Sequence, residues 1–298
     1  MKKILLIFSA IMLYSNLAFS AVENLSTGDV YLFGESNNNN LTVQDNQETL
    51  ALDEFDIQNN TQSSATATTD RFQIGIALTT GKREYKEMAK FEFMPLFDIK
   101  YKQFYLDKTV AGIYIIQNEE IKVSLVGEYN MASYDASKLP SPYNIIMNNR
   151  DNEIHGGFGI TFTPITDNNI EFNLRLTRDF VGKSNGFKTY IEAIRTIPYT
   201  QSIILKPKVL YTFMNRDYIN YYYGVTSSEA AKDTDVTAYS AQTSGYKFGF
   251  GFDLDYQISR TFTIKSFNKI EWHSNEITES PITEDLSIEI GGGFVLSL

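Results

Sequence analysis

Residues 71–298 alternate apolar and polar side chains in runs of about ten to thirteen residues, which constrains the fold more than any other feature. In the run 245–258, aromatic and aliphatic residues take every second position opposite Lys, Gly, Asp and Gln. Successive strand residues point to opposite faces, so such runs predict strands with one apolar face. Soluble strands are commonly about five or six residues long, whereas a tilted membrane-crossing strand needs about 9–11. The runs therefore predict a transmembrane barrel rather than a soluble sandwich.

The predicted fold class is all-β, a transmembrane antiparallel up-and-down β-barrel of about twelve strands (10–12). The expected strands lie at 71–80, 91–102, 104–116, 121–131, 153–163, 170–180, 187–197, 202–213, 245–258, 261–272 and 284–298. These are eleven ranges, an odd number, whereas single-chain bacterial barrels normally have an even number of strands. We therefore expect one further strand, either within 91–116 or at Val30–Phe33.

The connections between these strands alternate in length. Short ones are expected at 118–120, 164–169, 198–201 and 259–260, and longer ones at 132–152, 181–186, 214–244 and 273–283. Outer-membrane barrels have short periplasmic turns and long external loops. The alternation in length supports the barrel and gives its orientation.

The first twenty residues predict export. A positive Met1–Lys3 segment precedes an apolar run at 4–19, and small residues at Ala18 and Ser20 are typical of a cleavage site before Ala21. The alternative, a retained anchor, is disfavoured because a membrane-spanning helix needs about 20 apolar residues. We expect residues 1–20 to be a signal peptide and the protein to reside in the outer membrane of a Gram-negative-type bacterium.

Residues 21–70 differ in composition from the strands that follow. Asn37–Asn40 and Ser63–Thr69 are polar, low-complexity runs with little apolar surface to bury. Such segments do not gain enough burial to offset the entropy of ordering. We expect a polar, disordered N-terminal segment, followed by a barrel domain over 71–298.

Overall composition excludes several kinds of function. The formal net charge of −10 disfavours nucleic-acid binding, which requires clustered positive charge. The chain contains no cysteine, so a disulfide framework and cysteine-based metal or nucleophilic sites are excluded. No cofactor-binding motif is present, and we expect no cofactor.

The two histidines are the natural candidates for catalysis. Glu153 and His155 are two residues apart and share a strand face, whereas adjacent His273 and Ser274 would point oppositely. A catalytic site also needs a nucleophile or bound water and a charge-stabilising group, and no pattern indicates these. We expect solvated histidines at loop edges and no enzyme activity.

Charged residues on the inner faces of the last strands predict a polar lumen. They alternate with the apolar face and would form ion pairs inside either a narrow or a plugged channel. The candidate lumen charges are Lys247, Asp253, Asp255, Lys265 and Lys269.

Aromatic residues predict the membrane interface. Tyr221, Tyr222, Tyr223 and Trp272 are assigned to the aromatic girdle at the lipid headgroups, and a recognition patch is the alternative for the tyrosines. Thr226–Glu229 matches a capping box, which predicts a short helix within the 214–244 loop.

Acidic residues in the loops are weak candidates for binding divalent cations. Asp151, Glu153, Asp233 and Asp235 could bridge divalent cations to lipopolysaccharide, but solvated acidic loops are the favoured interpretation. The expected environment is outer-membrane lipid and lipopolysaccharide.

With these segments placed, the chain resembles the MipA/OmpV family of outer-membrane proteins over residues 71–298. The resemblance is carried by Tyr85–Glu87, Pro95–Tyr101, Gly249–Phe252 and, most specifically, Tyr222–Thr226 followed by Glu229–Ala231. It implies a barrel without catalytic residues. One branch is a scaffold linking a lytic transglycosylase to a murein synthase, and another is porin-like or adhesive. The resemblance therefore implies a non-enzymatic scaffold for peptidoglycan-remodelling enzymes first, with a narrow channel or an adhesin as alternatives.

Overall fold

The computed structural model describes residues 70–86 and 91–298, so the expected signal peptide and nearly all of the polar segment lie outside the described residues. Its long elements are β-strands. Their bounds are β1 (Arg71–Thr80), β2 (Glu92–Tyr101), β3 (Phe104–Asp107), β4 (Val110–Gln117), β5 (Ile121–Asn130), β6 (Glu153–Phe162), β7 (Ile170–Asp179), β8 (Phe187–Arg195), β9 (Ile197–Pro198), β10 (Ile203–Met214), β11 (Gly245–Gln257), β12 (Phe262–His273) and β13 (Leu286–Ser297).

The strands form one closed antiparallel sheet. Each long strand pairs with its neighbours in sequence, and β13 pairs with β1 to close the wall. The two-residue β9 pairs with β10 and continues the line of β8. The fold is therefore a closed antiparallel barrel of 12 strands, and the predicted fold class is confirmed.

The further strand lies within 91–116, so the first of the two expected sources is confirmed. The segment 104–116 supplies it, because it is a hairpin in which β3 and β4 are joined at Lys108 and Thr109. Lys108 takes the left-handed backbone conformation of this tight turn, with a φ of 51°. A lysine at such a position gives no sequence signal, because Gly, Asn and Asp are the residues that mark such turns. The alternative source of a strand, Val30–Phe33, lies outside the described residues.

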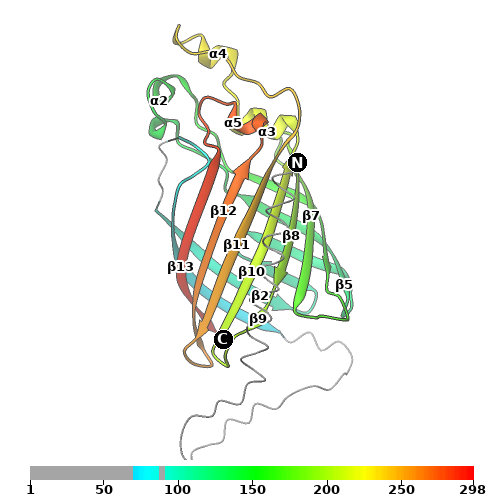
Figure 1. Cartoon of the computed structure of the whole chain (residues 1–298). Helices are drawn as coiled ribbons and strands as arrows, with labels where there is room; N and C mark the ends of the chain where they lie inside the picture. Colours follow the sequence, from blue (N-terminus) through cyan, green and yellow to red (C-terminus); the bar gives the residue numbers. More distant parts are fainter. Residues whose placement is uncertain (1–69, 87–90) are drawn as a thin grey trace, which may run out of the picture. The chain divides into compact units, whose positions relative to one another are not determined.

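Long loops and short turns lie at opposite ends of the barrel (Figure 1). All helices among the described residues belong to the loop end, and the turn after β2 and the last residue of β13 lie at the other end. The helices are η1 (Ala136–Lys138), α2 (Tyr143–Ile146), α3 (Arg216–Tyr223), α4 (Ser227–Ala230) and α5 (Asn275–Thr278). None of these helices is long and apolar enough to cross a membrane.

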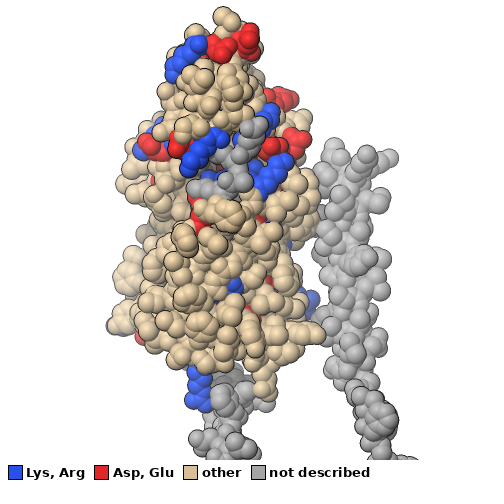
Figure 2. Space-filling model, turned by 90° about the vertical axis from the view of Figure 1, so that its left-hand side faces the viewer, with Lys and Arg blue, Asp and Glu red and all other residues tan. Residues whose placement is uncertain are grey.

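The outer face of the wall is apolar and exposed. Ile74, Phe158 and Ile191 from three separate strands are 38%, 54% and 43% exposed, and many outward-facing neighbours are similar. Figure 2 shows charged side chains gathered towards the loop end, with a mostly uncharged band below them. An exposed apolar band of this kind is the surface that a bilayer covers.

Candidate functional site

The loop end of the barrel is covered by α3. The side chain of Asn215 caps this helix by accepting a hydrogen bond from the Tyr218 amide. Tyr218 and Tyr222 are four residues apart, so they share one helix face, and both are buried. Together with loop residues they form the apolar cap of the barrel, which contains Tyr85, Tyr134, Ala136, Leu139, Ile146, Met147, Met214, Tyr218, Ile219, Tyr222, Tyr223, Val225, Ala230, Val236, Ala241, Ile277 and Ile282.

A buried ion pair joins two loops of the cap. Arg150 donates to both carboxylate oxygens of Glu229, at 3.0 and 3.1 Å. Burial alone would raise the pKa of Glu229, but the bonds from Arg150, Asn148 and Thr226 outweigh it and hold that pKa at about 2. Glu229 also closes the capping box of α4, so the predicted helix is confirmed. The carboxylate thus orders its own helix and ties it to the neighbouring loop.

The loop between β1 and β2 is tied to the same cap. Glu84 accepts a hydrogen bond from the Lys247 ammonium at 2.7 Å and one from the Tyr223 hydroxyl at 3.3 Å. Burial would raise the pKa of Glu84, and the charges of Lys247 and Arg83 hold it at about 2 instead. Tyr85 packs against the rings of Tyr134 and Tyr223.

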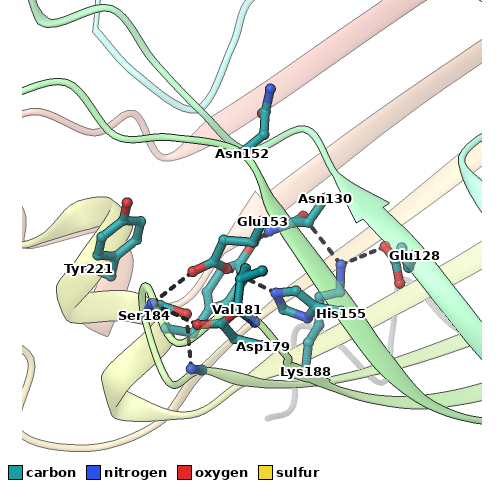
Figure 3. A network of polar contacts seen from close by, with 12 residues as sticks. Glu128, Asn130, Asn152, Glu153, His155, Asp179, Val181, Ser184, Lys188 and Tyr221 are labelled. Atoms are coloured by element: carbon teal, nitrogen blue, oxygen red, sulfur yellow. Dashed lines mark hydrogen bonds and ion pairs between the residues drawn. The ribbon is translucent and has the colours of Figure 1, made fainter.

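His155 lies inside a polar network beneath the cap (Figure 3). Its Nε2 lies 2.9 Å from Glu153, and both side chains are essentially inaccessible to solvent. Glu153 also accepts from the Ser184 amide at 2.8 Å, while the Ser184 hydroxyl accepts from the amide of Gly186. His155 is therefore not the solvated loop-edge residue that we expected. Its strand position is close to the loop end, but the loop after β7 folds over it.

The same network continues into the lumen wall. Lys188 donates to Glu128 at 2.7 Å and to Asn130 at 3.4 Å (Figure 3). Asp179 accepts the amides of residues 181, 182, 184 and 185, which shapes the turn after β7. These contacts give each of these charged side chains a partner, which offsets part of the cost of burial, although Oε2 of Glu128 is buried without a hydrogen bond. The second histidine, His273, is hydrogen-bonded to the Glu284 carbonyl and the Ser287 hydroxyl.

Two cavities lined by the described residues lie in the lumen. One, of about 310 Å³, lies beneath the cap, and the other, of about 630 Å³, extends towards the turn end. They share Arg175, Tyr190 and Glu271 as lining residues, so the two are adjacent. We call the second one the turn-end cavity, because its lining reaches Lys100 and Asn169 near the short turns.

The structure places all five candidate lumen charges around these cavities. Lys247 and Lys269 line the cavity beneath the cap, and Asp253, Asp255 and Lys265 line the turn-end cavity. Most of their ion pairs join neighbouring strands or a strand and a loop, whereas Lys269 and Glu271 both belong to β12. The pairs are Lys206–Asp255 at 2.6 Å, Lys208–Asp253 at 2.7 Å, Lys265–Asp255 at 3.6 Å, Lys269–Glu271 at 3.1 Å and Lys247–Glu84 at 2.7 Å.

The structure separates the four candidate girdle residues. Tyr222 and Tyr223 are 0% exposed and belong to the cap, so they do not face lipid. Tyr221 packs beside the Arg150 guanidinium. Trp272 is exposed near the loop end of β12, where its assignment to the girdle stays a prediction. The position of these tyrosines in the sequence suggested the membrane interface, but they belong to α3, which directs Tyr222 and Tyr223 into the cap.

The acidic loop residues do not gather into one site. Asp151 is exposed and pairs with Lys183 at 2.7 Å, Glu153 is buried against His155, and Asp235 is exposed on the loop after α4. Among residues 70–86 and 91–298, no three His, Asp or Glu side chains are placed to hold a metal ion.

Sequence reasoning missed Glu84 and Arg150, which connect the cap. The capping box located Glu229 correctly, but nothing in its spacing pointed to Arg150, 79 residues earlier. Glu84 belongs to a segment that was expected only to connect two strands. Pairings over such separations leave no local pattern, so a single sequence does not reveal them.

Comparison with protein families identifies one match. The model of the family described as MltA-interacting protein MipA matches residues 74–297, which span β1 to β13. A search of curated proteins finds no match.

Solved structures similar to this chain include three outer-membrane proteins. Outer-membrane expressed OmpT of Vibrio cholerae is 6% identical, with 77% of this chain and 97% of that chain covered and a TM-score of 0.36. The NanC porin is 7% identical, with 75% and 100% covered and a TM-score of 0.32. The N-terminal β-barrel domain of Pseudomonas aeruginosa OprF is 11% identical, with 77% and 99% covered and a TM-score of 0.26. Identities of this size say nothing about function.

Proposed function

This chain belongs to the MipA family, the MltA-interacting protein family, and from that premise we propose that it is a non-enzymatic scaffold for peptidoglycan-remodelling enzymes. It is an outer-membrane β-barrel, so its turn end faces the periplasm, where peptidoglycan lies. The partner that the family description implies is the lytic transglycosylase MltA. A murein synthase is the second partner that we propose.

The covered loop end is the observation that supports a scaffold over a wide diffusion pore. Seventeen buried residues pack there around α3, and buried ion pairs hold the loops together. Ordering these loop residues costs conformational entropy, and an open pore would not need this ordered cover. A barrel whose loop end is closed in this way suits a membrane anchor better than a wide pore.

Two parts of the chain are candidate surfaces for a periplasmic partner. The short turns carry little area, since the turns between strands there span only a few residues. We therefore propose that residues 21–70 serve as the docking arm. Residues 21–69 contain acidic side chains but no Lys or Arg, so the arm would suit a basic surface on the partner.

Capture of a lytic transglycosylase by the refolded protein tests this proposal. We expect the chain to retain the enzyme, and deletion of residues 21–69 to abolish retention while the barrel still folds. A matched control keeps the length of the arm but replaces its acidic residues by Asn and Gln, which should weaken capture if charge guides docking. Unchanged capture by the deletion variant would remove the arm from the proposal, and no capture by the intact chain would overturn the scaffold.

A narrow channel is the second candidate, favoured by the charged lumen and its two adjacent cavities. Planar-bilayer recording separates the two functions. The scaffold predicts no discrete conductance steps from refolded protein, and a channel predicts steps that change when α3 is deleted. The third candidate, surface adhesion, predicts host-cell binding that requires residues 214–244.

A further inference from the structure

The turn-end cavity has an aromatic surface on one wall. Tyr105 of β3 and Tyr114 of β4 both line it, and their rings stack with centroids 4.8 Å apart at an interplanar angle of 30°. The hydroxyl groups of Tyr105 and Ser124 are hydrogen-bonded at 3.0 Å, and this bond fixes the hydroxyl end of the Tyr105 ring. This aromatic pair is the product of the β3–β4 hairpin.

Glycine makes room for that surface. Gly112 is the register partner of Tyr105, and a Cβ added to it would lie 2.3 Å from the phenol ring. The ring therefore lies across β4 towards β5, flat against the wall. The Tyr105 hydroxyl comes close to a second glycine, since a Cβ on Gly159 would lie 3.8 Å away. The Tyr105 ring thus lies between the wall at Gly112 and the stacked ring of Tyr114, so Tyr114 supplies the ring face that is open to the lumen.

The rest of the lining is polar but electrically balanced. The turn-end cavity has as many basic as acidic side chains, nine of each. Lys206 and Lys208 are already paired with Asp255 and Asp253 at 2.6 and 2.7 Å. Ion pairing of this kind lowers the attraction of these two lysines for a free ion, because each is compensated by its partner. A strongly charged ligand is therefore not what the cavity selects.

Neutral hydrogen-bonding groups complete the lining. Asn168, Asn169 and Thr196 lie near the turn end, and the Thr161 hydroxyl donates to Asn173 at 2.7 Å. Amides and hydroxyls that converge on a cavity orient ligands rich in hydroxyl groups. The volume of about 630 Å³ lies within the range of about 300–1,000 Å³ that small ligands occupy.

We propose that the turn-end cavity binds an uncharged saccharide, with the Tyr114 ring, backed by Tyr105, as its stacking surface. A sugar ring presents polarised C–H groups on its face and hydroxyls around its edge. The C–H face suits the electron-rich face of an aromatic ring, and the hydroxyls suit the Asn, Thr and paired charged side chains. The lining reaches the short turns, so the saccharide would enter from the periplasm. This site does not depend on the scaffold role.

Calorimetric titration of the refolded protein with N,N′-diacetylchitobiose tests the proposal. We expect saturable binding whose Kd is unchanged between low and high salt, because no net charge is involved. Tyr114→Leu should weaken binding about tenfold, and Tyr114→Phe should retain it, since only the ring is needed. Tyr256→Leu, which removes an exposed tyrosine from β11, is the matched control and should bind as the unaltered protein does.

Other results would overturn the proposal. These are no heat release at millimolar saccharide, binding by Tyr114→Leu and Tyr105→Leu equal to that of the unaltered protein, or preference for an acidic sugar that disappears at high salt. The last result would assign the cavity to anions attracted by Lys100 and Lys122. Heat-modifiable migration on gels shows that each variant has folded. Because the titration contains no enzyme, its failure is distinct from failure of the capture experiment.

Discussion

The guanidinium of Arg150 and the carboxylate of Glu229 form two hydrogen bonds, of 3.0 and 3.1 Å, with 8% and 0% of their side chains exposed. Arg150 lies in the loop between β5 and β6, and Glu229 belongs to α4 in the loop between β10 and β11. Arg150 also donates to the Tyr221 carbonyl at 2.6 Å. The pair is thus the polar link between two loops that cover one end of the barrel.

Breaking this pair should loosen the cap. Arg150→Ala leaves the Glu229 carboxylate buried without its charge partner, which costs about 3–5 kcal/mol in comparable sites. We expect faster amide hydrogen exchange in α3 and α4 with the barrel strands unchanged. The exposed pair of Lys183 with Asp151 is the control, and Lys183→Ala should leave exchange in α3 unaltered. Equal amide hydrogen exchange in the Arg150→Ala and Lys183→Ala variants would show that the Arg150–Glu229 pair is not needed to hold the cap.

Acid should open the cap before it unfolds the barrel. The pKa of Glu229 and that of Glu84 are both lowered from 4.5 to about 2 in the folded protein. A lowered pKa contributes stability above pH 4.5, and this contribution is lost as the pH falls towards 2. We expect proteolysis of the loops to rise between pH 4.5 and 2, with an acid-stable protease such as pepsin as the probe. Glu229→Gln should weaken this pH dependence, and an identical profile would contradict the assignment.

The seam between β1 and β13 should not tolerate a side chain at Gly75. A Cβ there would lie 1.8 Å from the Phe294 carbonyl oxygen, so Gly75→Val forces the two strands apart. We expect loss of the heat-modifiable gel shift that marks a closed barrel. A Cβ on Gly127 would meet no atom within 4 Å, so Gly127→Ala is the control and should fold. A normal shift for Gly75→Val would mean that the seam can adjust.

Two isoleucines on β8 test which face contacts lipid. Ile191 is exposed on the outer face, whereas Ile194 lines the turn-end cavity. Ile191→Lys should lower the free energy of unfolding in vesicles by up to about 2–4 kcal/mol, the cost of a lysine near the bilayer midplane. Ile194→Lys should cost less, because the lumen already holds charged groups such as Glu171. Urea titration measures both, and the reverse order would invert the assignment of faces.

Much of the wall could be predicted from sequence because strand periodicity is local. Phe250 and Asp253 point to opposite faces in any strand with this spacing, whatever its neighbours are. The capping box at Thr226 likewise needs only four consecutive residues. The extra strand within 91–116 was among the expected alternatives, but the position of its turn at Lys108 was not predicted, because that turn lacks the residues that usually mark one.

The sequence alone determined the class of fold, the apolar side of strands such as β11 and the direction in which the loops project. Only the tertiary structure decided what covers the barrel. Tyr222 looked like an interface residue and His155 like a solvated one, yet both are fully buried. The physical reason is that alternation reports which way a side chain points, whereas burial depends on segments distant in sequence that fold over it. The alternation of apolar and polar residues can therefore be read from the sequence, whereas the cap depends on contacts between loops that are distant in sequence.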